Sequence, residues 1–324
     1  MSKKNISKCK IKTSIGGSAL IEGVMMKSPQ KCAMSVRIPD DTIDTEYIEA
    51  PSLIKKHKWL NIPIIRGCIN MVEQMIFSTK CLYKSAEKSG LALEEEVEEP
   101  SKFEKWIDKV FGDKLFGFIM SIGMVLGVAL SVVLFIYLPM IVVKGIETAT
   151  ISFFNFELGM FKNVIEGVIK LAIFIAYLAL VSNMKDIKRT FEYHGAEHKT
   201  IACFEAGEEL TPANARKFKR FHPRCGTSFM FIILILSIII SSFISWDNMI
   251  IRFLLKFAVI PVVVGLGYEL IKLAGKYDNI VTRTFSAPGM WMQRLTTKEP
   301  DDKQLEVAIS AMLAVIPDEN NKVL

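Results

Sequence analysis

Residues 115–143, LFGFIMSIGMVLGVALSVVLFIYLPMIVV, form the longest stretch of the chain without a charged side chain. An α-helix needs about 20 apolar residues to cross the hydrocarbon core of a bilayer. This stretch is longer than that, so we predict a membrane-spanning helix that tilts or extends beyond the hydrocarbon.

Three further apolar runs are long enough to span a bilayer, at residues 164–184, 227–245 and 250–274. Only Trp246 to Met249 separates the last two, so we expect them to form a tight helical hairpin. The predicted fold class is therefore an α-helical polytopic membrane protein with about four transmembrane helices and a small α+β cytoplasmic part.

Composition agrees with this class. The chain has 324 residues, of which 51% are hydrophobic and 23% charged, and its mean hydropathy is +0.32. The net charge of +6 suits the anionic inner leaflet of a bilayer, and no compact basic and aromatic module indicates nucleic-acid binding. The cysteines form no CxxC pair, so we expect no disulfide framework. They are Cys9, Cys32, Cys68, Cys81, Cys203 and Cys225.

The distribution of Lys and Arg predicts the orientation, because cytoplasmic loops carry an excess of both. The loop at 144–163 holds only Lys144 and Lys162, so we expect it outside. Arg252 and Lys256 oppose this assignment weakly, since their long side chains can snorkel outward. Both termini and the segment 185–224 are then cytoplasmic in a bacterial-type plasma membrane. That segment contains Lys185, Lys188, Arg189, Lys199, Arg216, Lys217, Lys219, Arg220 and Arg224.

The polar segments have their own signals. Ala33 to Ile48 predicts two short strands around a Pro39-Asp40-Asp41 turn. Trp59 to about Lys88 predicts an interfacial or half-buried helix, and Asp301-Asp302 opens an amphipathic helix that ends near Val315. The predicted organisation has three parts before the membrane domain: a basic tail at 1–15, an α+β segment at 16–92, and an acidic linker with a pre-membrane helix at 93–114. The membrane domain follows at 115–274 and contains a His-rich loop at 185–226. An amphipathic C-terminal segment occupies 275–324.

The sequence Tyr193-His194-Gly195-Ala196-Glu197-His198 contains the pattern H-x-x-E-H. Residues four apart share one face of a helix, so His194 and His198 could offer two ring nitrogens to one divalent metal, for which zinc is the expected ion. Glu197 could then act as general base without being a ligand, as in the inverzincin arrangement. The alternative is a pair of exposed histidines on an amphipathic helix.

Three residues elsewhere could complete a metal site. His222 and Cys225 lie at the start of the third span, and both are plausible ligands or ordinary residues at a membrane boundary. Glu269 lies near the cytoplasmic end of the fourth span, where a carboxylate by default marks a functional site or a buried pair. We expect it to converge with the two histidines. The alternative is a salt bridge to Lys272 or Arg220.

Other features indicate packing. Glu166 and Lys170 are spaced as an ion pair on one helix face near the outer end of the second span. The segment Gly16-Gly17 to Gly23 lacks the spacing of a nucleotide-binding loop but predicts a tight turn, from which Glu22 could point at a site.

Six stretches together resemble the bacterial YqhQ family, a membrane family of unknown function whose members are described as predicted metal-dependent enzymes. They are GGSALIEGVMMKSP from Gly16, IPIIRG from Ile62, YHGAEHKT from Tyr193, RFHPRCGTSF from Arg220, YELIKLAG from Tyr268 and APGMWMQRLTTKEPDDKQLEVAI from Ala287. The resemblance covers nearly the whole chain from Gly16. It implies a metal-dependent activity and no particular substrate.

Two functions fit these observations. The first is a membrane-embedded metal-dependent hydrolase whose site, at the cytoplasmic leaflet, acts on a lipid-linked, peptide or amphipathic substrate. The second is a non-catalytic membrane scaffold with a structural metal or none, whose cytoplasmic part binds a protein partner. Four protein ligands would favour the scaffold, and three ligands plus water would favour the hydrolase. The substrate and the oligomeric state stay open.

Overall fold

The computed structural model describes residues 13–50, 52–90, 115–156, 158–159, 161–222, 225–244, 248–276 and 280–316. The chain divides into two compact units. We call the described residues within 1–93, 178–235 and 261–324 the sheet unit, and those within 94–177 and 236–260 the helical unit. Most of the expected basic tail, the acidic linker and the turn at Trp246 lie outside the described residues.

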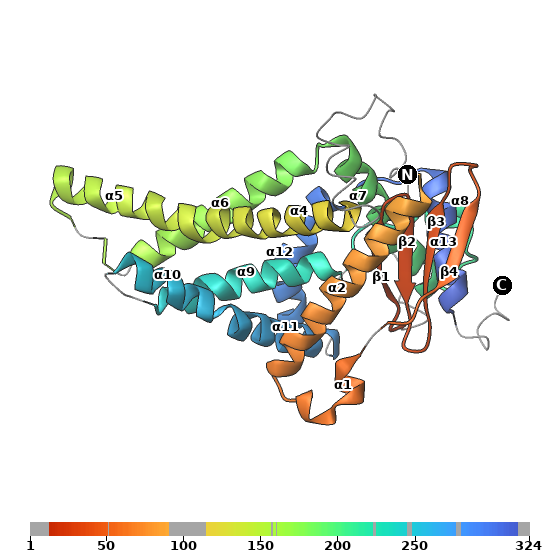
Figure 1. Ribbon diagram of the computed structural model, residues 1–324, viewed down its shortest axis with the longest axis horizontal. Coiled ribbons are helices and arrows are strands. Elements are labelled where there is room, and N and C mark those ends of the chain that lie inside the picture. Colours follow the sequence, from red (N-terminus) through yellow and green to blue (C-terminus); the bar gives the residue numbers. More distant parts are fainter. Residues whose placement is uncertain are drawn as a thin grey trace. The chain divides into compact units, whose positions relative to one another are not determined.

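A four-stranded antiparallel meander organises the sheet unit (Figure 1). Its strands, in spatial order, are β1 (Gly16–Leu20), β2 (Gly23–Lys27), β3 (Cys32–Arg37) and β4 (Ile43–Tyr47). The strand pair predicted around the Pro39-Asp40-Asp41 turn is confirmed as β3 and β4. The sequence does not predict β1 and β2, because residues 24–26 are buried on both faces and so show no alternation of apolar and polar side chains.

Helices α7 (Lys185–Glu205) and α13 (Asp302–Val315) pack with one face of the sheet. The predicted C-terminal helix is confirmed, and its start is set by a capping box. Asp301 accepts a hydrogen bond from the backbone N–H of Gln304, whose side chain accepts one from the N–H of Asp301. The shared core includes Val24, Met26, Ala33, Tyr193, Ala196, Leu305 and Met312.

Helix α2 (Ile65–Lys88) packs against the opposite face of the sheet through Phe77 and Cys81. Its opposite side is apolar but exposed, and Val72 and Met75 are both more than half exposed. The predicted helix is confirmed, although the segment from Trp59 begins as a short 3₁₀ turn and Pro63 separates that turn from α2. The unit also contains α1 (Leu53–Lys56), α8 (Pro212–Ala215), α11 (Ile260–Lys276) and α12 (Ile280–Thr296).

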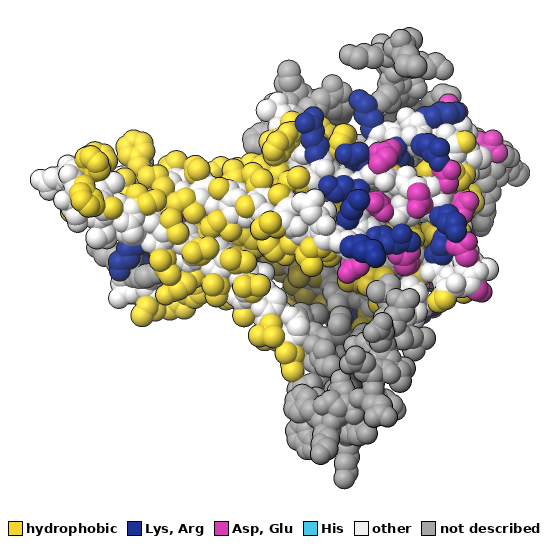
Figure 2. All heavy atoms as spheres, turned by 90° about the horizontal axis from the view of Figure 1, so that it is seen from above, with side chains coloured by type: hydrophobic (Ala, Val, Ile, Leu, Met, Phe, Trp, Pro, Cys, Tyr) yellow, Lys and Arg dark blue, Asp and Glu magenta, His cyan; other side chains and the backbone are white. Residues whose placement is uncertain are grey.

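Long apolar helices make up the helical unit. The first runs through α4 (Leu115–Val132), a π-helical turn (Val133–Tyr137) and α5 (Leu138–Phe154). The others are α6 (Phe161–Val181), α9 (Gly226–Ser242) and α10 (Met249–Ala258), of which α6 and α9 each continue into the sheet unit. Apolar side chains cover much of the surface of the helical unit, whereas acidic and basic side chains alternate over the sheet unit (Figure 2).

Three helices in the described part of the chain are long and apolar enough to cross a membrane: Val125–Phe154, Phe161–Val181 and Ile250–Leu273. They correspond to the first, second and fourth predicted spans. The third predicted span is present as α9, whose apolar stretch Phe229–Ser242 is shorter than these. The chain is therefore mostly helical, with three helices that fit association with a membrane.

The first span differs from its predicted bounds. The loop expected from Lys144 is helical as far as Phe154, and Asn155 ends the helix with a φ of 51°. Pro139 lies inside this continuous helix, directly after the π-helical turn Val133–Tyr137, and such a turn is a local adjustment by which a helix accommodates the N–H that proline lacks. Apolar residues after Lys144, such as Ile151 and Phe153, continue the span.

Candidate metal centre

Helix α7 carries the H-x-x-E-H pattern, and the prediction that this segment is helical is confirmed. From Tyr193 onward nearly every residue of the helix is buried, since the sheet and α13 pack on it. Gly195 permits a close approach of α12's C-terminal end, because a Cβ there would lie 2.0 Å from the carbonyl oxygen of Lys298. The two histidines of the pattern are therefore inside the sheet unit and not on a solvated surface.

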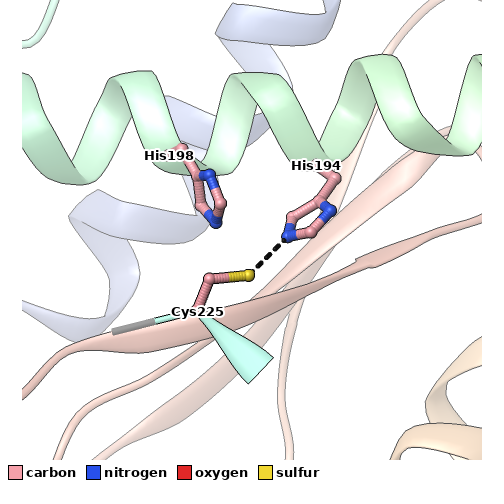
Figure 3. A group of neighbouring side chains, drawn as sticks. All are labelled: His194, His198 and Cys225. Carbon is pink, nitrogen blue, oxygen red and sulfur yellow. Dashed lines mark hydrogen bonds between the residues drawn. The ribbon is translucent and has the colours of Figure 1, made fainter. Parts of the chain in front are cut away.

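Both histidines point toward Cys225, which immediately precedes α9 (Figure 3). The potential ligand atoms of His194, His198 and Cys225 lie within 4.8 Å of one another. His194 Nε2 is 3.1 Å from the Cys225 sulfur, and the two imidazole centroids are 4.4 Å apart. A tetrahedral zinc ion holds such ligand atoms about 3.3–3.8 Å apart, so small side-chain rotations would bring all three to one ion.

Hydrogen bonds define which nitrogen of each ring is available. His194 Nδ1 lies 2.9 Å from the carbonyl oxygen of Thr296, and His198 Nδ1 lies 2.6 Å from that of Arg220. A carbonyl oxygen only accepts, so both Nδ1 atoms must carry the proton. In the neutral form of each ring, Nε2 is then left with a lone pair. Metal-ligating histidines are characteristically oriented in this way, with the other ring nitrogen donating to a carbonyl or carboxylate.

Burial favours the same protonation state. His198 is 1% exposed, and desolvation, the largest cause, lowers its pKa. The hydrogen bonds with Cys225 and the carbonyl of Arg220 raise the pKa of His198, while the charge of a protonated His194 lowers it. A neutral imidazole is the form that binds a metal.

Cys225 is surrounded by donors. The backbone N–H of Thr227 donates to its sulfur at 3.4 Å, and the hydroxyl of Thr227 lies 3.2 Å from the same atom. The sulfur also lies at the N-terminus of α9, where unpaired N–H groups and the helix dipole favour negative charge. These features suit a thiolate ligand.

Glu197 lies beside this group and is 4% exposed. It accepts a hydrogen bond from the backbone N–H of Gly17, while its Oε2 is buried without a hydrogen-bond partner among the described residues. Burial raises the pKa of Glu197 to about 7, although His194 and the bond from Gly17 act in the opposite direction. The carboxyl can therefore gain or lose a proton near neutral pH.

Gly17 is a residue whose role the sequence does not reveal. A Cβ at this position would lie 2.6 Å from the carbonyl oxygen of Met25 and 2.9 Å from the carboxyl group of Glu197. Only glycine therefore lets β1 approach Glu197 this closely. The clustered glycines are the available signal, and the sequence suggests only a turn for them.

Glu22 occupies that turn, with a φ of 49°. Its carboxylate accepts hydrogen bonds from Arg189, with Nη2 at 2.6 Å, and from the hydroxyl of Tyr193 at 3.0 Å. Glu22 thus ties the β1–β2 turn to the first half of α7 and is not a member of the ligand group.

His222 is close to the ligand group but outside it. Its ring centroid lies 5.7 Å from that of His198, and its Nε2 lies 3.7 Å from a carboxylate oxygen of Glu205. Gln293 fixes its backbone through two hydrogen bonds, at 2.8 Å to the N–H and 2.7 Å to the carbonyl. These contacts indicate that His222 positions the segment leading to Cys225.

The structure does not bring Glu269 to the histidines. Its carboxylate forms a bidentate pair with Arg66 of α2, with Arg66 Nε 2.6 Å from Oε1. Arg220, one of the alternative partners, pairs with Glu299 instead. Near Glu269, α2 and α11 approach closely. Gly67 permits this approach, because a Cβ at that position would lie only 3.0 Å from the Cα of Gly265. The expected convergence of Glu269 with the metal ligands is therefore corrected, since Arg66 neutralises it.

Comparisons with known proteins give two matches. The family model described as "Protein of unknown function (DUF1385)" matches residues 62–318. A protein of Bacillus subtilis (strain 168), described as "Uncharacterized protein YqhQ", is 32% identical over 323 residues, which cover 98% of this chain and 98% of that protein. No solved structure matches the chain. The range matched by the family model contains the two histidines, Glu197 and Cys225.

Proposed function

Since the chain belongs to the DUF1385 family of proteins of unknown function, its chemistry must be inferred from its own side chains, and we propose that it is a membrane-embedded metal-dependent hydrolase. One observation supports this most directly. His194, His198 and Cys225 present two lone-pair nitrogens and a sulfur within 4.8 Å of one another. Nitrogen and sulfur ligands in this number suit a divalent ion, and zinc is the expected one.

Ligand number favours catalysis over a closed structural site. The group holds three protein ligands among the described residues, and a tetrahedral ion keeps its fourth position open in such a set. When bound, the ion would supply Lewis acidity, which polarises the scissile group and lowers the pKa of a coordinated water.

Glu197 supplies the proton transfer in this proposal. Its buried Oε2 has no hydrogen-bond partner among the residues that the structure describes, and a pKa of about 7 makes the carboxylate a base at neutral pH and the carboxylic acid a proton donor afterwards. The carboxylate takes a proton from the attacking water at Oε2 and returns it to the leaving group. Gly17 holds the other oxygen, which leaves Oε2 for this role.

The location of the site is also part of the proposal. We place both termini and the segment 185–224 in the cytoplasm and count α9 as a fourth span. The surplus of Lys and Arg in that segment supports this orientation. The site then opens at the inner leaflet, where a lipid-linked, peptide or amphipathic substrate can reach it from the bilayer.

Metal analysis of the purified full-length protein tests the proposal. We expect about one equivalent of zinc in the wild type and at least a tenfold loss of affinity in His194→Ala and Cys225→Ser. His57→Ala is the matched control, because His57 is exposed and lies outside the ligand group. If the wild type neither retains zinc after mild purification nor takes it up when zinc is added, the proposed metal site is wrong. The proposed hydrolase activity is then wrong as well.

A structural metal in a non-catalytic scaffold is the second candidate. The observation that favours it is burial, since His198 and Glu197 are 1% and 4% exposed. X-ray absorption of the zinc-loaded protein separates the two functions. Three protein ligands plus one light oxygen ligand support the hydrolase, whereas four protein ligands support the scaffold.

A further inference from the structure

A second polar cluster lies in the helical unit, away from the residues of the proposed metal centre in the sequence. Five side chains from α6 and α10 form it: Asn163, Glu166, Lys170, Arg252 and Lys256. Its four charged members are each no more than 7% exposed. The Glu166–Lys170 interaction predicted from the sequence is present, whereas the expectation that Arg252 and Lys256 snorkel outward is corrected, because both are buried and pair with Glu166.

Glu166 is the only carboxylate of this cluster and is already shared. Arg252 Nη2 donates to its Oε2 at 2.6 Å and to the side-chain oxygen of Asn163 at 2.7 Å. Lys256 donates to the other oxygen, Oε1. Both oxygens of the carboxylate therefore have a cationic partner, which leaves little capacity for a third.

Two cationic groups have unused binding capacity. Arg252 Nε is buried and has no hydrogen-bond partner in the part of the chain that the structure describes. Lys170 lies one helical turn after Glu166 and interacts with its charge, but no hydrogen bond or ion pair of Lys170 occurs within the described residues. Among the described residues, three cationic side chains thus face one carboxylate, an excess of two positive charges. An excess of buried charge is costly in an apolar helical bundle and by default marks a functional site.

We propose that Lys170, Arg252 and Lys256 form a binding site for an anion that bears phosphate. Arginine presents a planar fork that matches phosphate oxygens, and lysine adds a compact charge. An anion with one or two negative charges would neutralise the cluster, and its oxygens could accept from Lys170 and from Arg252. This inference does not depend on the metal centre.

The position of the cluster along its helices suits the headgroup region of a bilayer. Asn163 and Arg252 belong to the first turns of α6 and α10, and Lys256 follows one turn later. At 1.5 Å per residue these three groups lie within about 11 Å of the helix starts, and Lys170 lies about 14 Å from the start of α6. A lipid headgroup or a soluble phosphate compound could therefore supply the same chemistry.

Lys170 is the best residue for a test, because it stabilises no partner through a hydrogen bond. Full-length protein in neutral detergent is titrated with phosphatidylglycerol, which is anionic, and with phosphatidylcholine, which carries no net charge, and binding is followed by native mass spectrometry. We expect preferential binding of phosphatidylglycerol and about a tenfold weaker affinity in Lys170→Met. Lys144→Met is the matched control, because Lys144 is an exposed lysine of the same unit.

Inorganic phosphate and pyrophosphate form the second arm of the experiment. Binding of either in place of phosphatidylglycerol, again weakened in Lys170→Met only, supports the site and identifies a soluble ligand. Equal affinity of wild type and Lys170→Met for every anion would overturn the proposal. So would equal binding of anionic and neutral lipid without binding of phosphate. In those cases the cluster only locks α6 to α10.

Discussion

Individual hydrogen bonds determine what the residues of α7 can do. Two carbonyl oxygens fix the tautomers of His194 and His198, and one glycine N–H fixes the carboxylate of Glu197. Each such bond is worth about 1 kcal/mol, which is little for stability. Their effect is directional, because together they turn lone pairs toward the sulfur of Cys225 and leave Oε2 of Glu197 without a partner in the described part of the chain.

Glu197→Gln separates catalysis from metal binding. An amide removes the base but no ligand, so we expect metal content to stay at the wild-type level and hydrolysis to fall at least about 100-fold. The measurements are elemental analysis and turnover in a screen of lipid-linked and peptide substrates, with the exposed Glu208→Gln as control. Loss of the metal in Glu197→Gln would instead make Glu197 a ligand or a support of one.

The cysteines should differ in their reactivity toward iodoacetamide. Cys203 is fully buried, and burial raises the pKa of its thiol to about 11, so we expect it to stay unmodified in the folded protein. Cys225 is only half-buried and should react in metal-free protein but not after zinc is added. Peptide mass spectrometry measures both sites in one sample. Modification of Cys225 at an equal rate with and without zinc would contradict its role as a ligand.

Gly17→Ala should destabilise the sheet unit, because the new methyl group would collide with Met25 and Glu197. Overpacking of this kind costs about 1–3 kcal/mol. The neighbouring Gly16→Ala is the control, since a Cβ at Gly16 meets nothing within 4 Å. Thermal unfolding followed by circular dichroism should give a lower midpoint for the first variant only. Equal midpoints would show that β1 moves away from Glu197 without cost.

At the scale of whole elements, some parts of the fold can be read from the sequence. Local signals suffice for α13, where Asp301 and Gln304 form a capping box, and for α7, whose pattern has helical spacing. Strand β2 is not predictable in this way, because its apolar side chains are buried on both faces of the sheet. Apolar length predicts four spans, of which three are long and apolar enough in the described structure, and it misplaces the end of the first.

The partners of Glu269 illustrate what local patterns miss. The sequence offers Lys272 and Arg220 as cations, whereas the structure provides Arg66, more than 200 residues away. Such a pair depends on the packing of α2 against α11, and no periodicity within either helix indicates it. Likewise, choosing among His222, Cys225 and Glu269 as the third ligand requires tertiary structure.

Glu269→Gln tests that reassignment. We expect zinc content equal to that of the wild type, because Arg66 and not a metal is the partner of Glu269. Arg66→Gln should give the same result, and His194→Ala serves as the positive control for metal loss. A strong loss of zinc in Glu269→Gln would restore Glu269 as a ligand.

At the scale of the whole molecule, orientation in the bilayer can be tested with the ends of helices. Asn155 ends α5 and Glu208 is exposed after α7, so cysteines at these two positions report on opposite sides of the proposed topology. A membrane-impermeant maleimide applied to intact cells should label Asn155→Cys and not Glu208→Cys. Unsubstituted protein gives the background from native cysteines. Labelling of Glu208→Cys from outside would reverse the orientation.

The carbonyl oxygen that holds His194 belongs to Thr296, about a hundred residues later in the chain. Between them lie the segment that ends at Cys225 and helices α9 to α12. During synthesis on the ribosome, residues 194–198 therefore emerge long before their ring orientations can be fixed. The centre is completed only after the last apolar helices have been inserted and α12 has been translated. In the proposed metal centre, loading is thus expected to be a late step of biogenesis, and a chain truncated before Thr296 should lack the carbonyl oxygen that holds His194.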